Sequence, residues 1–453
     1  MITAIGLVTV VVYGLYLSMY LSPPLTGDEV YYYRQVGRFR TIILLLLQWD
    51  LAAIPDVFHQ IIENGWFIPL TSALLAPASF FGSEPEAVRL IYFTINLILH
   101  GLILELMRRN FGLLAMILFH AISLLFPPYM VFMVSLFGEG LASRLLLVIA
   151  LWLYMILGRE RAVSVRETFF LGCLLALTVL LRHNLLLVCP VVALAVLFDT
   201  SRKTEGPFPA WLQPGVLRAS LLTVVVCGAL LPWSLSLSKK FDGPYLTVTT
   251  HQIADVWRNA TPAFTQERLG TEQPQGNPFW QWSTYYRDLA RSTDRSYYEL
   301  VEADRERLQA ILSTDLEHQE RLARNRKIAR ERARGPSEFV LRRLMGPVKD
   351  AEPLSMRAQK FYAFVDPLNR WLWKPLLVLG LLAPLLLFGL SRKNRPGQLV
   401  IGALLYVNAG TLFLHAAHTR HFALLYPMLI FVVSVAAAML LQRGQRGRQL
   451  VSG

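Results

Sequence analysis

The hydrophobic pattern of this chain consists of long uninterrupted apolar runs rather than apolar positions spaced along one helix face. Runs near 20 residues are typical of membrane-spanning helices, because about 20 residues at a rise of roughly 1.5 Å cross the ~30 Å hydrocarbon core. The pattern predicts an all-α polytopic membrane protein with about ten spans, of which the fifth and sixth are short. The predicted spans are Ile2–Leu21, Glu86–Met107, Leu113–Tyr129, Leu141–Leu157, Thr168–Leu181, Leu185–Phe198, Leu221–Ser238, Lys374–Leu390, Leu399–Leu414 and Phe422–Leu441.

The polar segments between the apolar runs predict that the chain has three parts. Residues 1–238 form an N-terminal transmembrane module with a long first loop at 22–85, residues 239–373 a soluble insert, and residues 374–453 the C-terminal helices. In the first loop, the Pro-interrupted apolar stretch Trp66–Gly82 predicts a helix in the membrane interface, whereas the apolar patch Ile42–Leu51 is too short to span. The insert is expected to be mostly helical, with one helix from Thr284 to about Arg334 that Gly335-Pro336 ends.

Charge and composition predict which side of the membrane each loop faces. The chain is 54% hydrophobic and 17% charged, with a formal net charge of +13. Nucleic acid is not the expected partner, because in a membrane protein an excess of Lys and Arg usually holds loops in the cytoplasm. The basic residues gather in alternate connections and in the tail, at Arg108-Arg109, Arg159 to Arg166, Arg202 to Arg218, Arg392 to Arg395 and Arg443 to Arg448. Both termini are therefore expected in the cytoplasm, with the first loop and the insert outside a bacterial inner (plasma) membrane.

Two adjacent carboxylates follow the first apolar run, in Leu25-Thr26-Gly27-Asp28-Glu29-Val30. Ionised groups near hydrocarbon are costly, at roughly 2.5–3.5 kcal/mol for the bilayer centre on insertion scales, so such groups usually belong to a polar site. The alternative is that Asp28 and Glu29 mark the membrane boundary and pair with Arg34 or Arg38.

Further short motifs follow Asp28-Glu29 in a fixed order. They are Trp66-Phe67-Ile68-Pro69-Leu70, Phe81-Gly82 with Arg89, Phe137-Gly138-Glu139-Gly140, Leu181-Arg182-His183-Asn184, Arg420-His421-Phe422 and Tyr426-Pro427. This order, on one predicted membrane face, resembles the GT-C superfamily of membrane glycosyltransferases, which includes protein O-mannosyltransferases and the aminoarabinose transferase of lipid A. The chain departs from that pattern at His421, where Tyr is common, and it has no His-Pro before Asp28.

The resemblance implies an inverting glycosyltransferase that moves a sugar from a polyprenyl-phosphate carrier to an acceptor hydroxyl on a lipid, glycan or protein outside the cytoplasm. Asp28 is then the expected base, with Glu29 orienting it or the acceptor and Glu139 as the second acidic residue. The leaving phosphate needs cationic donors, and a guanidinium binds phosphate with two parallel hydrogen bonds. The expected donor-binding residues are Arg420, Arg182, His183, Arg144, His418 and His421.

Structural alternatives exist for each of these. In these alternatives, Arg144 would pair with Glu139 across the start of a helix, and Arg182 would extend to the interface as a helix-end anchor. Glu139 would then be an acidic residue at a helix N-terminus that complements the helix dipole. His415, His418 and His421 leave a divalent metal site open, but positions i and i+6 diverge by roughly 120° on a helix, so imidazoles assisting Arg420 are favoured. No cofactor other than the donor lipid is expected.

A transporter or flippase of an anionic lipid-linked glycan is the main alternative function. Transporters commonly contain inverted repeats and helices broken near mid-membrane. Here the polar residues collect at one predicted face, and the spans show no paired halves. A ligase acting on a pyrophosphate-linked glycan would call for more Arg near the site.

Overall fold

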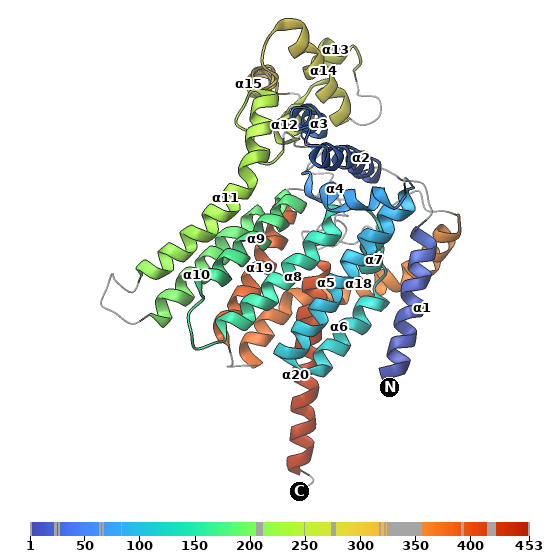
Figure 1. The fold of residues 1–453 in the computed structure, drawn as a ribbon, viewed down its shortest axis with the longest axis vertical. Coiled ribbons are helices and arrows are strands. Elements are labelled where there is room, and N and C mark those ends of the chain that lie inside the picture. The colour runs from blue at the N-terminus through green and yellow to red at the C-terminus, as the bar shows by residue number, and fades with distance from the viewer. Residues whose placement is uncertain are drawn as a thin grey trace. The chain divides into compact units, whose positions relative to one another are not determined.

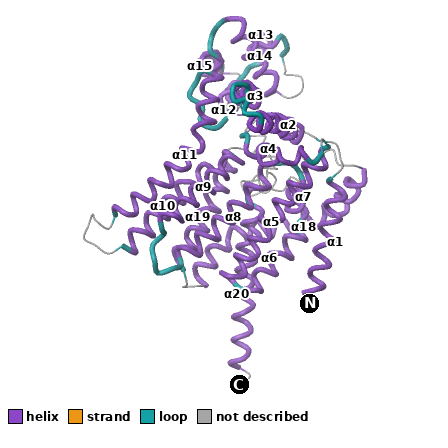
Figure 2. The backbone as a smooth tube through the Cα atoms, viewed as in Figure 1, coloured by secondary structure: helices purple, strands orange, loops and turns teal. Residues whose placement is uncertain are grey.

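The computed structural model is helical throughout its described part, which contains no strand (Figure 2). That part comprises residues 2–21, 25, 28–62, 65, 68–82, 84–204, 212–248, 250–272, 278–316, 319–320, 323, 356–390, 394–414 and 423–451. Contacts divide the chain into two compact units: unit 1 contains residues 1–40, 70–229 and 343–453, and unit 2 contains residues 41–69 and 230–342. Residues 41–69 and 230–238 of the predicted N-terminal part thus belong with most of the insert, whereas residues 343–373 of the predicted insert belong to unit 1 with the C-terminal helices.

Unit 1 is a bundle in which α8 (Gly138–Leu157) is the inner helix (Figure 1). Nearly all side chains of α8 are buried, and it contacts α5, α7, α9, α19 and α20. The other elements of unit 1 are α1 (Ile2–Tyr20), α4 (Leu70–Leu75), η1 (Ala76–Phe80), α5 (Pro85–Phe111), α6 (Leu113–Leu125), α7 (Pro127–Val134), α9 (Val165–Leu181), η2 (His183–Leu187), α10 (Val188–Lys203), α18 (Met356–Leu390), α19 (Arg395–Leu414) and α20 (Tyr426–Val451). Helices α2 (Asp28–Leu47) and α11 (Gln213–Phe241) begin in unit 1 and end in unit 2.

The chain is a multi-pass helical membrane protein. Six helices of the described part are long and apolar enough to cross a membrane, or up to seven if one bent pair counts as a span. The six are Pro85–Phe111, Gly138–Leu157, His183–Lys203, Gln213–Phe241, Trp371–Gly389 and Tyr426–Gln445. The count of ten spans stays a prediction, since α1, α9 and α19 fall in predicted spans but not among these six.

The third predicted span, Leu113–Tyr129, is not one straight helix. Helix α6 ends at Leu125, Phe126 is extended, and α7 starts at Pro127 with its axis turned by 79°. The Pro127-Pro128 pair causes the break, because proline disfavours helical backbone at the residue before it and fits the first turn of a new helix.

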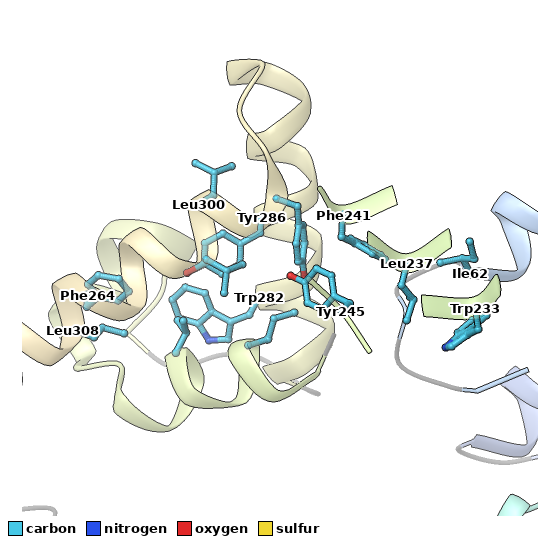
Figure 3. Close-up of a cluster of buried hydrophobic side chains, with 14 residues drawn as sticks. Ile62, Trp233, Leu237, Phe241, Tyr245, Phe264, Trp282, Tyr286, Leu300 and Leu308 are labelled. Carbon is cyan, nitrogen blue, oxygen red and sulfur yellow. The ribbon is translucent and has the colours of Figure 1, made fainter. Parts of the chain in front are cut away.

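Unit 2 has its own aromatic core (Figure 3). Trp282 is fully buried and stacks on Phe264 and Tyr286, with ring centroids 6.1 Å and 5.9 Å apart. The C-terminal end of α11 contributes Trp233, Leu237 and Phe241 to this core. Five further helices of the described part belong to the unit: α3 (Ile54–Ile62), α12 (Thr250–Asn259), α13 (Pro262–Leu269), α14 (Pro278–Thr293) and α15 (Tyr297–Thr314).

The single helix predicted from Thr284 to Arg334 is wrong at residues 294–296. Helix α14 ends at Thr293, and Asp294 adopts a left-handed φ of 53°. Ser296 then caps α15, its hydroxyl accepting from the backbone N–H of Glu299 at 3.0 Å. Asp and Ser favour such turns and caps because their short side chains bond the local backbone. Residues 324–334 lie outside the described part.

Candidate functional site

Arg89 of α5 holds both ends of the connection that leads to Asp28. Its Nη1 donates to the carbonyl oxygen of Leu21 at 3.0 Å, and its Nη2 donates to Oε2 of Glu29 at 2.9 Å. The second oxygen of Glu29 accepts from the backbone N–H of Leu136 at 3.0 Å. Because a guanidinium offers donors in a rigid plane, one buried side chain fixes the end of α1 and the first turn of α2 together.

Asp28 is the first residue of α2, and its side chain lies outside the described part. Glu29 is 6% exposed and pairs with Arg89 rather than with Arg34 or Arg38. The boundary-pairing alternative is therefore wrong for Glu29. The carboxylate of Glu29 holds α2 against α5 and the 135–137 segment.

A second buried ion pair joins the start of α8 to the end of α9. Nη2 of Arg182 donates to Oε1 of Glu139, and both side chains are almost inaccessible to solvent. This contact corrects two expectations: Arg182 does not extend to the interface, and Glu139 does not pair with Arg144. Arg182 has extended backbone directly after α9, which turns its side chain back towards α8.

Arg144 binds backbone carbonyl groups in place of a carboxylate. Its guanidinium donates to the oxygens of Gly140 at 2.7 Å and Tyr129 at 3.0 Å, and to Oδ1 of Asn96 at 3.0 Å. It also lies over the ring of Tyr129, 4.3 Å from the centroid. Arg144 therefore ties α5, α7 and α8 together through these oxygens.

Two glycines allow this packing at the start of α8. A Cβ on Gly140 would meet the carbonyl oxygen of Phe132 and the hydroxyl of Tyr92, and a Cβ on Gly138 would lie 2.6 Å from the carbonyl oxygen of Leu181. The Tyr92 hydroxyl in turn donates to the carbonyl oxygen of Phe137. The segment between α7 and α8 is thus held by backbone contacts that no larger residue permits.

The polar residues of α5 form a stripe that the sequence-based reasoning did not use. Arg89, Tyr92, Asn96 and His100 recur at spacings of three and four, so they share one helix face. His100 continues the network: its ring nitrogens bond the Tyr129 hydroxyl at 2.7 Å and His120 at 3.0 Å. A polar stripe in an apolar helix is the signal that could have identified Tyr92 and Asn96.

The remaining predicted donor-binding residues are only partly placed. Arg182 and Arg144 lie in the buried network, and His183 follows Arg182 as the first residue of η2. Arg420, His418 and His421 are outside the part of the chain that the structure describes, and so is His415. Among the described residues no group of three or more His, Cys, Asp or Glu is arranged to hold a metal ion.

The buried ion pairs and Arg144 together form a network that contains charges of both signs. Glu29, Glu139, Arg89, Arg144 and Arg182 carry two negative and three positive charges, all on buried side chains. One turn beyond Glu29, burial raises the pKa of Tyr33, and the carboxylates of Glu84 and Glu86 raise it further. Tyr33 is therefore a neutral hydroxyl over the physiological pH range.

No protein-family model matches the chain, and no curated protein or solved structure matches it. The chain's own residues are therefore the basis for assigning a function.

Proposed function

We propose that this chain is an inverting membrane glycosyltransferase that transfers a sugar from a polyprenyl-phosphate carrier to an acceptor hydroxyl at the extracytoplasmic face, with both termini in the cytoplasm. The observation that carries the proposal is the Arg89 clamp. Its buried hydrogen bonds to Leu21 and Glu29 hold the end of α1 and the first turn of α2, where Asp28 is the first residue, on the same side chain. Positioning of one carboxylate at the edge of a helical membrane bundle is what a catalytic base requires.

In this reaction Asp28 accepts the proton of the acceptor hydroxyl. The acceptor oxygen forms a bond to the anomeric carbon from the face opposite the carrier, and the bond from that carbon to the phosphate oxygen breaks. The phosphate leaves with the electron pair, so the configuration at the anomeric carbon inverts. Glu29 is a positioning residue, because both of its oxygens are engaged by Arg89 and Leu136.

The lipid phosphate is assigned to cationic residues, with Arg420 as the first candidate and His183, His418 and His421 assisting. The guanidinium of Arg182 contributes through its pair with Glu139, which holds the end of α9 against the start of α8. Arg144 is assigned a scaffolding role rather than phosphate binding, because its donors are directed to Gly140, Tyr129 and Asn96.

One observation favours the alternative of a transporter or flippase for an anionic lipid-linked glycan. The α6–α7 pair is a span bent by 79°, and broken helices of this kind form cargo sites in transporters. The carbonyl oxygens of Tyr129 and Phe132 in α7, however, accept hydrogen bonds from the guanidinium of Arg144, at 3.0 Å and 3.4 Å. They serve the protein's own side chain, so glycosyl transfer is the better supported of the two functions.

The test is transfer from a panel of radiolabelled polyprenyl-phosphate sugars by the purified chain in lipid bilayers, with a mixed lipid and glycan extract as acceptor. Asp28→Asn should lower the transfer rate by about 10²- to 10⁴-fold while donor binding persists, as expected for loss of a general base. Asp56→Asn is the matched control, because Asp56 is an exposed carboxylate on α3 in the same predicted loop. Equal rates for Asp28→Asn and the wild type would refute the assignment of Asp28, and carrier-lipid movement without transfer would favour the flippase.

A further inference from the structure

The C-terminal end of α2 has an unusual residue at its helix-ending position. The N–H of Asp50 bonds the carbonyl oxygen of Leu45 at 3.0 Å, and the N–H of Trp49 bonds that of Leu46 at 3.2 Å. This pair of bonds is the Schellman motif, in which the residue after the cap adopts a left-handed conformation and is usually glycine. Here the residue is Trp49, with a φ of 57°.

Trp49 is an exception among the described residues. The other non-glycine residues with positive φ are Asp242, Asp294 and Asn394, the types that tolerate this conformation best. A bulky side chain there is strained, and strained residues persist where they serve a function. The Trp49 side chain is 85% exposed, so no packing within the protein offsets the strain.

The residues around Trp49 form an exposed tip, which we call the apolar tip and define as Leu44, Leu46, Leu47, Trp49 and Leu51, with the exposed polar residues Gln48 and Asp50 between them. Leu44, Leu46, Leu47 and Leu51 are 37%, 50%, 71% and 55% exposed. At about 100° per residue, Leu44 and Leu46 point to nearly opposite sides of the helix. A protein partner would cover one stripe of such a helix, whereas lipid can surround all of it.

We propose that the apolar tip inserts into the interfacial layer of a lipid bilayer, with the leucines among the upper acyl chains and the Trp49 indole at the headgroup level. The chain is a multi-pass membrane protein, so a bilayer is always present. Tryptophan is enriched at this depth because its ring is apolar and its N–H is polar. Arg38 and Arg40 precede the apolar run on the same helix and complement the headgroup phosphates in charge.

The proposal is independent of the glycosyltransferase assignment, and the test uses the full chain in nanodiscs. Cys173, Cys189 and Cys227 are first replaced by Ser, and a bimane label is then attached to Leu47→Cys or, in a second variant, to Leu316→Cys. Leu316 is the matched control, because it is also a leucine of unit 2 and is also 71% exposed. Size-exclusion chromatography verifies that each variant is folded.

Phospholipids carrying a nitroxide on the upper acyl chain should quench bimane at position 47 several-fold more than bimane at position 316. Aqueous iodide should quench the two labels in the opposite order. If both labels respond to iodide alone, the tip is in water and the proposal is wrong. If the label at position 47 responds to neither quencher, protein covers the tip, and the proposal is also wrong. In that case, quenching that changes with protein concentration would identify a second copy of the chain as the cover.

Discussion

At the scale of single residues, Arg89 and Glu29 show how this chain places charge inside an apolar bundle. Each is almost fully buried, and each bonds both to its partner and to backbone, at Leu21 and Leu136. A buried ion pair adds little net stability compared with a well-packed apolar pair, but the loss of one partner leaves an uncompensated buried charge. The pair therefore specifies how the start of α2 sits against α5 more than it stabilises the fold.

The Arg89→Met variant should accordingly be destabilised by about 3–5 kcal/mol, because Glu29 would remain buried without its cation. The double variant with Glu29→Gln should lose clearly less stability than the sum of the two single variants, since no isolated charge remains. Thermal or denaturant unfolding in detergent measures all three proteins. Additive losses would show that the two side chains do not interact in the folded protein.

At the scale of elements, the close contact between α7 and α8 depends on Gly140. Gly140→Ala should destabilise the protein by about 1–3 kcal/mol, because the new methyl group would collide with the carbonyl oxygen of Phe132 and the Tyr92 hydroxyl. Gly101→Ala in α5 is the control, since nothing lies within 4 Å of its added Cβ. There, alanine should be neutral or stabilise by about 0.5–1 kcal/mol through its helix propensity. Unfolding measurements on both variants test the contrast.

Most helices, but not their interruptions and contacts, could be predicted from the apolar runs. The runs predicted α5 and α8 within a few residues, because a long apolar stretch has few alternatives in a membrane. The Pro127-Pro128 break was missed although proline carries a clear signal for it. The Glu139–Arg182 pair spans a sequence separation of 43 residues, and only the packing of α8 against α9 brings it together. Asp28 as a base stays a prediction.

At the scale of the whole molecule, the aromatic core of unit 2 should make the stability of that unit depend on pH. Burial raises the pKa of Tyr245, Tyr286 and Tyr297 in the core of unit 2, and the Asp304 carboxylate, which accepts a hydrogen bond from Tyr286 at 2.9 Å, raises that of Tyr286 further. A raised pKa in the folded state means that the folded form holds its protons more tightly than the unfolded form. The contribution of these tyrosines to the free energy of unfolding is complete at pH values below about 10, which is the pKa of tyrosine in the unfolded chain. It is lost as the pH rises beyond that value.

Unit 2 should therefore lose its tertiary structure at alkaline pH. Near-ultraviolet circular dichroism and tyrosinate absorbance, recorded together, should show unfolding of the aromatic core and ionisation of its tyrosines in one transition. Tyr286→Phe should make the pH dependence shallower, because one titrating group is removed. Ionisation of the buried tyrosines near pH 10 without loss of structure would contradict this account.

The buried charges of α8 have a consequence for the order in which the membrane bundle assembles. A single helix that carries Glu139 and Arg144 near its start enters lipid less readily than an apolar one, since a charge costs roughly 2.5–3.5 kcal/mol at the bilayer centre and less towards the interface. Asn96 and Tyr129, which bind Arg144, precede α8 in the chain and are already synthesised when it emerges. Arg182, which neutralises Glu139, comes after it. During biosynthesis, the partners of Arg144 on α5 and α7 are thus already present when α8 is made. The partner of Glu139 is present only after α9 has been made.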